Sequence, residues 1–131
     1  MKYLLDTNIC IYFFKGLFNL KEKIAEIGYY NIALSELTLA ELYYGAEKSA
    51  FVDKNKQIVD MFSNNLTVLP ISNSIELYAR EKARLRKIGQ IISDFDLLIG
   101  TTAITYNLIM VTRNLREFER IHNITLENWA N

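Results

Sequence analysis

Six acidic side chains stand near the places where predicted strands end or predicted helices begin, so they can gather at one site. They are Asp6, Glu41, Asp94, Asp96, Glu117 and Glu119. Carboxylate oxygens without histidine or cysteine suit a hard cation such as Mg²⁺ or Mn²⁺, which prefers oxygen ligands and keeps several waters. Such a site hydrolyses phosphodiesters by activating a water and stabilising the leaving oxygen. The acids therefore indicate metal-dependent phosphodiester chemistry.

Each acid also has a purely structural interpretation. Asp6 could cap a helix, although an acid directly after a buried strand is costly unless it has a partner or a function. Thr38 and Glu41 match a capping box, and Asp94 and Asp96 would favour the dipole of a helix that starts at this point. The two later glutamates could lie on a solvated face. It is the combination of acids that favours a site.

Two other reactive residue types are scarce. The chain has one cysteine, Cys10, and one histidine, His122. These counts exclude a disulfide framework within the chain and a cysteine-rich zinc site, and they disfavour a histidine-based metal site or a serine-type triad. Cys10 is expected to be a small buried hydrophobe, and His122 a surface residue.

The bulk composition describes a globular protein of one domain. The 131 residues contain no linker, repeat or low-complexity stretch, so we expect a single domain over residues 1–131. Fifteen Lys and Arg balance fifteen Asp and Glu, so any nucleic-acid-binding surface must be local. The start of the chain lacks the organisation of a signal peptide, and the apolar run at 9–14 is shorter than the roughly 20 residues that cross a bilayer. We expect a cytoplasmic protein without a membrane partner.

Short apolar runs alternate with helical segments and would position the acids. Predicted strands lie at residues 3–5, 32–34, 66–69 and 108–111, with a possible edge strand at 124–126. Helices are predicted at 9–15, 18–27, 37–46, 52–62, 72–87, 93–104 and 115–120. This alternation indicates an α/β fold: a three-layer α/β/α sandwich with a short, mainly parallel sheet of four to five strands. Ligands of such sheets bind at the carboxyl ends of the strands, where the acids are expected.

Five segments resemble, in order, the motifs of the PIN-domain ribonucleases, and among them the VapC-like toxins. The segments are Leu4-Leu5-Asp6-Thr7-Asn8, residues 37–46 around Glu41, residues 94–100 around Asp96, residues 111–121 after the fourth strand, and Leu126-Glu127-Asn128-Trp129. The resemblance covers nearly the whole chain. A PIN-like fold is what it implies.

The resemblance implies roles for particular acids. Asp6, Asp96 and Glu41 would bind Mg²⁺ or Mn²⁺, with Glu117 as the nearest candidate for a fourth catalytic acid. Supporting polar groups would come from Thr112, Asn114 and Asp94. Asp94 stands beside Asp96 and competes with it for the metal-binding role.

The resemblance also implies an activity and partners. The activity would be a metal-dependent endoribonuclease that cuts a tRNA or an rRNA loop and so inhibits translation, acting as the toxin of a VapBC-like pair. The partners would be the RNA, a VapB-like antitoxin and a second copy in a homodimer. Arg84, Arg113 and Arg116 are candidates for contacts with RNA phosphates, although a solvated helix face explains Arg84 equally well.

Three alternatives remain open from the sequence. A signalling module of the receiver kind also has a small doubly wound fold with acids and Mg²⁺, but Leu69-Pro70 stands where an acid would close the third strand. A catalytically silent RNA-binding module would keep the same pocket. A structure-specific DNA nuclease would use similar acids, although the short chain leaves little room to clamp a DNA junction.

Overall fold

A five-stranded parallel sheet forms the centre of the molecule, which a computed structural model describes over residues 1–131. The strands are β1 (Tyr3–Leu5), β2 (Ile32–Ser35), β3 (Thr67–Leu69), β4 (Ile109–Val111) and β5 (Leu126–Glu127). They lie in the order β3-β2-β1-β4-β5, and every neighbouring pair is parallel. The predicted sheet of short parallel strands is therefore confirmed, and β1, where the chain begins, is its middle strand.

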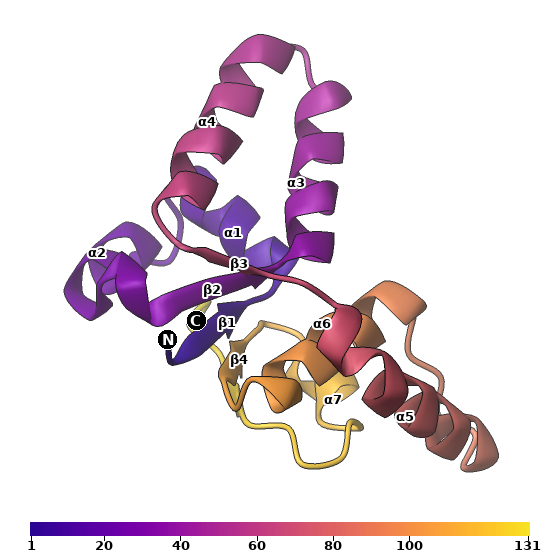
Figure 1. Cartoon of the computed structure of the whole chain (residues 1–131). Coiled ribbons are helices and arrows are strands. Elements are labelled where there is room, and N and C mark those ends of the chain that lie inside the picture. The colour runs from indigo at the N-terminus through magenta and orange to yellow at the C-terminus, as the bar shows by residue number, and fades with distance from the viewer.

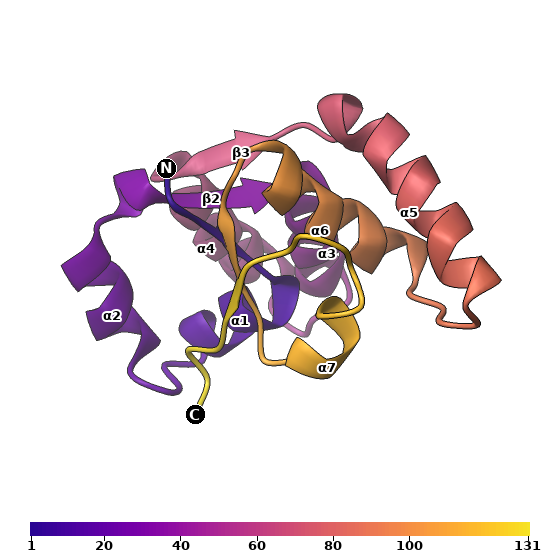
Figure 2. The same ribbon diagram turned by 90° about the horizontal axis from the view of Figure 1, so that it is seen from below.

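Helices cover both faces of this sheet (Figures 1 and 2). On one face lie α1 (Thr7–Phe14), α2 (Leu20–Ile27), α3 (Glu36–Glu47) and α4 (Val52–Asn64). On the other lie α5 (Ile75–Lys87), α6 (Asp94–Thr105) and α7 (Leu115–Phe118). Short 3₁₀ turns at Tyr29–Asn31 and Ser72–Ser74 precede β2 and α5. The result is the three-layer α/β/α sandwich that the alternation of elements predicts.

Each side of the sheet has its own apolar core, because neighbouring side chains on a strand point to opposite faces. Leu5 pairs with Val111, and both are fully buried in the cluster under α1 to α4. Leu4 pairs with Met110, and both are buried in the cluster under α5 to α7. The carboxyl ends of β1 and β4 are thus held side by side between two packed layers. No helix of the structure has the length and apolar character that crossing a membrane requires.

The structure corrects two sequence-based expectations about where elements begin. The second helix starts at Leu20 rather than at residue 18, because Phe18 and Asn19 both adopt the left-handed conformation with φ of 58° and 55°. The capping box of Thr38 and Glu41 was wrong: α3 begins earlier, and its N-cap is Ser35, whose hydroxyl accepts the Leu37 amide at 3.1 Å. Glu41 is consequently free of any helix-capping role.

A candidate active site at the carboxyl edge of the sheet

Asp6 lies at the junction of β1 and α1 and is 7% exposed. Its Oδ1 accepts the Thr7 amide at 2.8 Å, so it caps α1 as one of the two interpretations predicted. Its Oδ2 accepts the hydroxyl of Thr112, which follows the neighbouring strand β4, at 2.8 Å. Thr112 Oγ1 in turn accepts the Asn114 amide at 3.0 Å. The two strand ends are therefore joined through this carboxylate, and its orientation is fixed.

Burial dominates the electrostatics of Asp6. Burial, together with the negative charges of Asp96 and Glu41, raises the pKa of this carboxyl from 3.8 to about 6. The hydrogen bonds from Thr112 and Thr7 act in the opposite direction and lower the pKa. Asp6 therefore sits near two other acids in a setting that disfavours its negative charge, which is the electrostatic condition that a cation would relieve.

Glu41 reaches this edge of the sheet from α3. Its Oε1 accepts the hydroxyl of Thr7 at 2.6 Å. The same Thr7 hydroxyl lies 3.2 Å from the hydroxyl of Thr38, which is fully buried one turn before Glu41. A threonine directly after Asp6 thus holds the second acid in place. Sequence reasoning assigned no role to Thr7, although its position directly after Asp6 was the available signal.

Asp96 and Glu117 face each other from α6 and α7. The hydroxyl of Ser93 accepts the Asp96 amide at 3.3 Å and caps α6. Burial, and then a hydrogen bond and charge repulsion with Asp96, raise the pKa of Glu117. Asn114 donates its side-chain amide to Glu117 Oε2 at 2.6 Å. The structure therefore brings Asp6, Glu41, Asp96 and Glu117 to one edge, with Thr112 and Asn114 as hydrogen-bonding supports.

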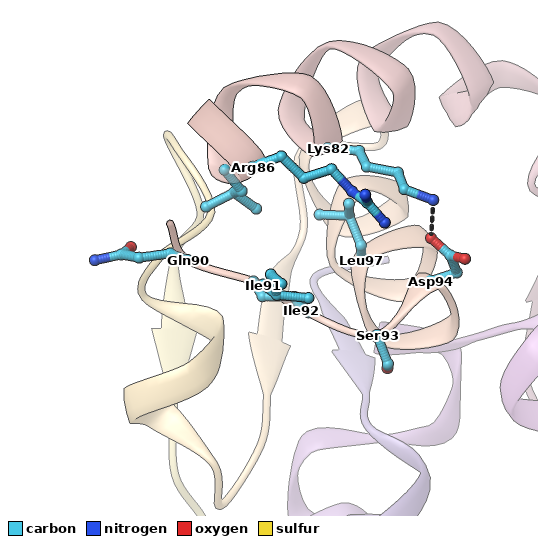
Figure 3. A pocket seen from close by; sticks show the side chains of 9 residues that line it. Lys82, Arg86, Gln90, Ile91, Ile92, Ser93, Asp94 and Leu97 are labelled. Carbon is cyan, nitrogen blue, oxygen red and sulfur yellow. Dashed lines mark hydrogen bonds and ion pairs between the residues drawn. The ribbon is translucent and has the colours of Figure 1, made fainter. Parts of the chain in front are cut away.

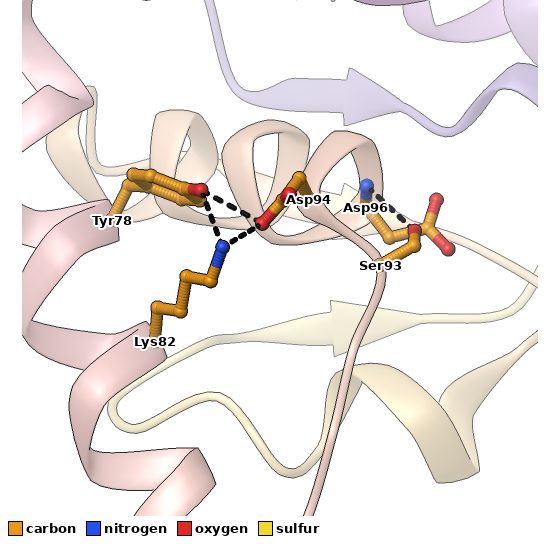
Figure 4. Close-up of polar contacts among 5 residues, drawn as sticks. All are labelled: Tyr78, Lys82, Ser93, Asp94 and Asp96. Carbon is orange, nitrogen blue, oxygen red and sulfur yellow. Dashed lines mark hydrogen bonds and ion pairs between the residues drawn. The ribbon is translucent and has the colours of Figure 1, made fainter.

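Asp94 is not part of this cluster, although it was expected to support it. Its carboxylate accepts the Tyr78 hydroxyl at 2.7 Å and the Lys82 ammonium at 2.8 Å, both from α5. The hydrogen bonds from Lys82 and Tyr78 lower the pKa of Asp94. Asp94 and Asp96 point in different directions from the first turn of α6, and only Asp96 points away from Lys82 (Figure 4). Asp96 is therefore the acid of this pair that lies in the cluster, whereas Asp94 connects α5 to α6.

The three arginines expected to contact RNA differ in whether their side chains already form hydrogen bonds or ion pairs within the chain. Arg84 forms two hydrogen bonds to Glu81, at 2.9 and 2.8 Å, and donates a third to the Arg120 carbonyl at 2.7 Å. It therefore joins α5 to the segment after α7. Arg113 and Arg116 are exposed and take part in no ion pair, so both remain open to a ligand.

The donor chemistry of the cluster fits a hydrated hard cation. All four acids offer oxygen, and two of them, Asp6 and Glu117, have raised pKa values where they face other carboxylates. No three acidic, histidine or cysteine side chains lie close enough together to enclose an ion. Mg²⁺ usually binds through one or two carboxylates and keeps its other ligands as water, so an open arrangement of this kind suits it.

Two hollows flank the cluster. A groove of about 500 Å³ runs between α1, α3 and α4, with Glu41 at one end and a largely apolar lining that includes Ile11, Gly45 and Val59. A smaller pocket of about 170 Å³ lies between α5 and the segment that leads into α6 (Figure 3). The groove contains one of the four acids, whereas the small pocket opens on the Lys82–Asp94 pair.

Comparisons with known proteins agree with this architecture over almost its whole length. Residues 3–123 match the PIN domain. Ribonuclease VapC2 of Rickettsia felis is 40% identical over 134 residues that cover 98% of each chain. The tRNA(fMet)-specific endonuclease VapC of Salmonella typhimurium is 37% identical, with 99% of each chain covered. The crystal structure of DNA-bound VapBC from Salmonella typhimurium contains a chain with a TM-score of 0.92 and 35% identity, over 98% of both chains.

Proposed function

The chain belongs to the PIN-domain family of VapC ribonucleases, and on this premise we propose that it is an endoribonuclease and the toxin of a VapBC-like toxin–antitoxin pair. The observation that carries the proposal is the meeting of Asp6, Glu41, Asp96 and Glu117 at the carboxyl edge of the sheet. A tRNA is the first substrate to test, because a relative covering the whole chain is named a tRNA(fMet)-specific endonuclease. Cleavage of such an RNA would stop translation.

The proposed cofactor is Mg²⁺ or Mn²⁺. Asp6 and Asp96 would hold it most directly, with Glu41 and Glu117 binding it or its waters. Bound there, the ion would lower the pKa of a water and stabilise the leaving oxygen of the phosphodiester. The raised pKa values of Asp6 and Glu117 support this assignment, since a cation stabilises the ionised form of every carboxylate in the cluster.

The surrounding residues hold the acids in productive orientations. Thr112 and the Thr7 amide occupy one lone-pair direction on each oxygen of Asp6 and leave the others free. The Thr7 hydroxyl does the same for Glu41, and Asn114 for Glu117. These three acids can then accept a hydrogen bond from an attacking water or a ligand without changing their rotamers. Groups that orient metal-binding carboxylates contribute strongly to affinity and activity.

We propose that the groove between α1, α3 and α4 receives the antitoxin. Its lining is largely apolar, and it ends at Glu41, so an apolar segment lying in it could present a basic side chain to the acids. The tight superposition on a chain of a VapBC complex supports this partner. A homodimer is proposed as well, on the basis of the family.

The experiment is cleavage of tRNA and total RNA by purified protein freed of antitoxin, with Mg²⁺, with Mn²⁺ and with EDTA. Asp6→Asn and Asp96→Asn test the acids. Asp94→Asn is the matched control, because Asp94 lies two residues before Asp96 and contacts α5 instead. We expect discrete fragments that require both a divalent ion and the two tested acids. Cleavage that persists in EDTA, or in both acid variants, would contradict the proposal.

A further inference from the structure

Arg113 lies against a packed pair of aromatic rings, Tyr12 and Phe18. Its guanidinium carbon lies 5.8 Å from the ring centre of Tyr12 and 5.3 Å from that of Phe18. The two rings meet edge to face, with centres 5.3 Å apart, and we call this pair the aromatic clamp. Arg113 directly follows Thr112, the residue that hydrogen-bonds Asp6. The backbone of Arg113 therefore adjoins the residue that orients Asp6.

Arg113 keeps its hydrogen-bonding capacity unused. It is exposed, forms no ion pair and donates no side-chain hydrogen bond within the chain. The other cation–ring contacts involve a lysine over a single ring. A guanidinium that lies against aromatic rings can still donate its N–H groups, in the fork that matches the oxygens of a phosphate. The arrangement immobilises the side chain without neutralising it.

The clamp depends on an uncommon backbone conformation. Phe18 and Asn19 adopt φ of 58° and 55° in succession, which is rare for a bulky side chain such as phenylalanine. This turn between α1 and α2 places the Phe18 ring against both Tyr12 and Arg113. Unfavourable conformations of this kind persist where surrounding contacts enforce them, and they are frequent at functional sites. The strain is consistent with a role for the ring beyond filling the core.

A cation is needed at this position if RNA is to bind. Four carboxylates at the catalytic edge repel a phosphate backbone, and the chain as a whole has a formal net charge of zero. Contacts to phosphates come mainly from arginine and lysine, and they set the register of a nucleic acid on a protein. Arg84 is already committed to Glu81, and Lys82 to Asp94. Arg113 is the uncommitted cation that directly adjoins the Asp6–Thr112 pair.

We propose that Arg113 and the aromatic clamp form a phosphate-binding subsite, which holds the RNA backbone at a phosphate next to the one that is cut. The inference rests on the proposed ribonuclease function. The clamp reduces the rotamer freedom that Arg113 loses when the phosphate binds. The residue thus positions RNA rather than acting on the reacting atoms.

The test measures binding of fluorescein-labelled tRNA by anisotropy in EDTA, where the metal-dependent reaction is off, over a series of salt concentrations. Arg113→Gln should weaken binding about tenfold and reduce the slope of log K against log salt by about one. Phe18→Leu and Tyr12→Leu keep the charge and should weaken binding about threefold each, since they remove one cation–π contact. Arg80→Gln is the matched control, because this arginine is exposed on α5, forms no ion pair and lies over no ring.

Turnover and stability measurements separate the possible roles of Arg113. With Mg²⁺ present, Arg113→Gln should raise KM while kcat changes by less than about threefold, as expected for uniform binding energy. The thermal midpoint should stay within about 2 °C, which a purely structural stack would not predict. Unchanged binding and salt slope in Arg113→Gln, or a fall in kcat at constant KM, would overturn the subsite alone. Failure of the unaltered protein to bind or cut tRNA would overturn the proposed function and the subsite together.

Discussion

Thr112 donates its hydroxyl to Asp6 Oδ2 at 2.8 Å, across 106 positions of sequence. This bond joins the carboxyl ends of β1 and β4 and orients the most buried acid of the cluster. Thr112 is itself fully buried, so no water can replace its hydroxyl. The orientation of Asp6 in the acidic cluster therefore depends on a residue that is not itself an acid.

Removing this hydroxyl should impair activity more than stability. Thr112→Val preserves the shape of the side chain but leaves Asp6 Oδ2 without its donor. We expect RNA cleavage to fall about 10- to 100-fold, the usual effect of losing a group that orients a metal ligand. The free energy of unfolding should fall by about 1 kcal/mol. Thr112→Ser keeps the hydroxyl and should retain most activity, so equal losses in both variants would contradict this role.

Asp6→Asn should stabilise the metal-free protein. The folded-state pKa of Asp6, about 6, lies above its ordinary value of 3.8, so this carboxyl favours folding below pH 3.8 and loses that contribution as the pH rises through 6. At pH 7 the charged, buried carboxylate destabilises the folded state. Asparagine is neutral and can still cap α1. In EDTA, urea unfolding should show a gain of about 2 kcal/mol.

The same measurement with Mg²⁺ gives the control for that prediction. A bound cation should stabilise the unaltered protein but not Asp6→Asn. The difference in free energy of unfolding between the two proteins should therefore shrink or change sign when Mg²⁺ is added. Glu119→Gln changes an exposed acid nearby and should behave like the unaltered protein in both conditions. A destabilised Asp6→Asn in EDTA would show that the charge of Asp6 is satisfied without a metal.

Asp94 and Asp96 should respond differently to the same substitution. Asp96→Asn should reduce cleavage by more than about 100-fold, because a direct ligand is expected to matter more than its supports. Asp94→Asn should leave turnover within about threefold and instead weaken the contact between α5 and α6. Steady-state kinetics on tRNA, together with thermal unfolding, would check both. A larger catalytic loss for Asp94→Asn would reverse the two assignments.

Glu81 should give stability that depends on pH. It accepts two hydrogen bonds from Arg84 and one from the His122 amide at 2.9 Å, and the contact with Arg84 is the main reason that its pKa is lowered. A lowered pKa means that the stabilisation is present above the ordinary value of 4.5 and is lost as the pH falls through the folded-state pKa. Glu81→Gln should cost about 2 kcal/mol at pH 7 and progressively less below pH 4.5.

The matched control for Glu81 lies on the same helix. Glu76 is exposed and has no ion-pair partner, so Glu76→Gln should change stability by less than about 0.5 kcal/mol at either pH. Urea unfolding at pH 7 and pH 4 provides both values. A cost for Glu81→Gln that does not shrink in acid would mean that packing, rather than the charge, is responsible.

Gly45 allows the groove to be blocked without touching the acids. It lies in the last turn of α3 and lines the groove, and a Cβ added there would meet no atom within 4 Å. Gly45→Ala should stabilise the protein by about 1 kcal/mol, since glycine is unfavourable inside a helix. Gly45→Phe should fill the groove, keep RNA cleavage within about threefold and weaken neutralisation by the antitoxin. Unimpaired antitoxin binding in titrations of Gly45→Phe would exclude the groove as its site.

The sequence predicted the architecture and the candidate acids Asp6, Glu41, Asp96 and Glu117, the architecture and Asp6 for identifiable physical reasons. Alternation of short apolar runs with helical segments specified a parallel sheet, and Asp6 stood out because a charge after a buried strand requires an explanation. The roles of Asp94 and Asp96 were not separable, because their directions depend on Tyr78 and Lys82 of another helix.

Other features were hidden for similar reasons. The pattern of Thr38 and Glu41 fitted a capping box, yet the helix begins at Glu36 with Ser35 as its cap. The left-handed conformation of Phe18 was not predicted: Gly16 and Asn19 are residues that tolerate φ above zero, but a phenylalanine between them normally does not adopt it. Local sequence patterns therefore did not determine the start of α3 or the conformation of Phe18.

The central position of β1 affects when the enzyme can first become active during synthesis. Its neighbour β4 and the Asp6 partner Thr112 are translated more than a hundred residues after β1, and β5 later still. A nascent chain can form its first helices early, but it cannot close the middle of the sheet until the last third has left the ribosome. The residues that line the groove are therefore made first, whereas Asp96, Thr112 and Glu117 join Asp6 only near the end of synthesis.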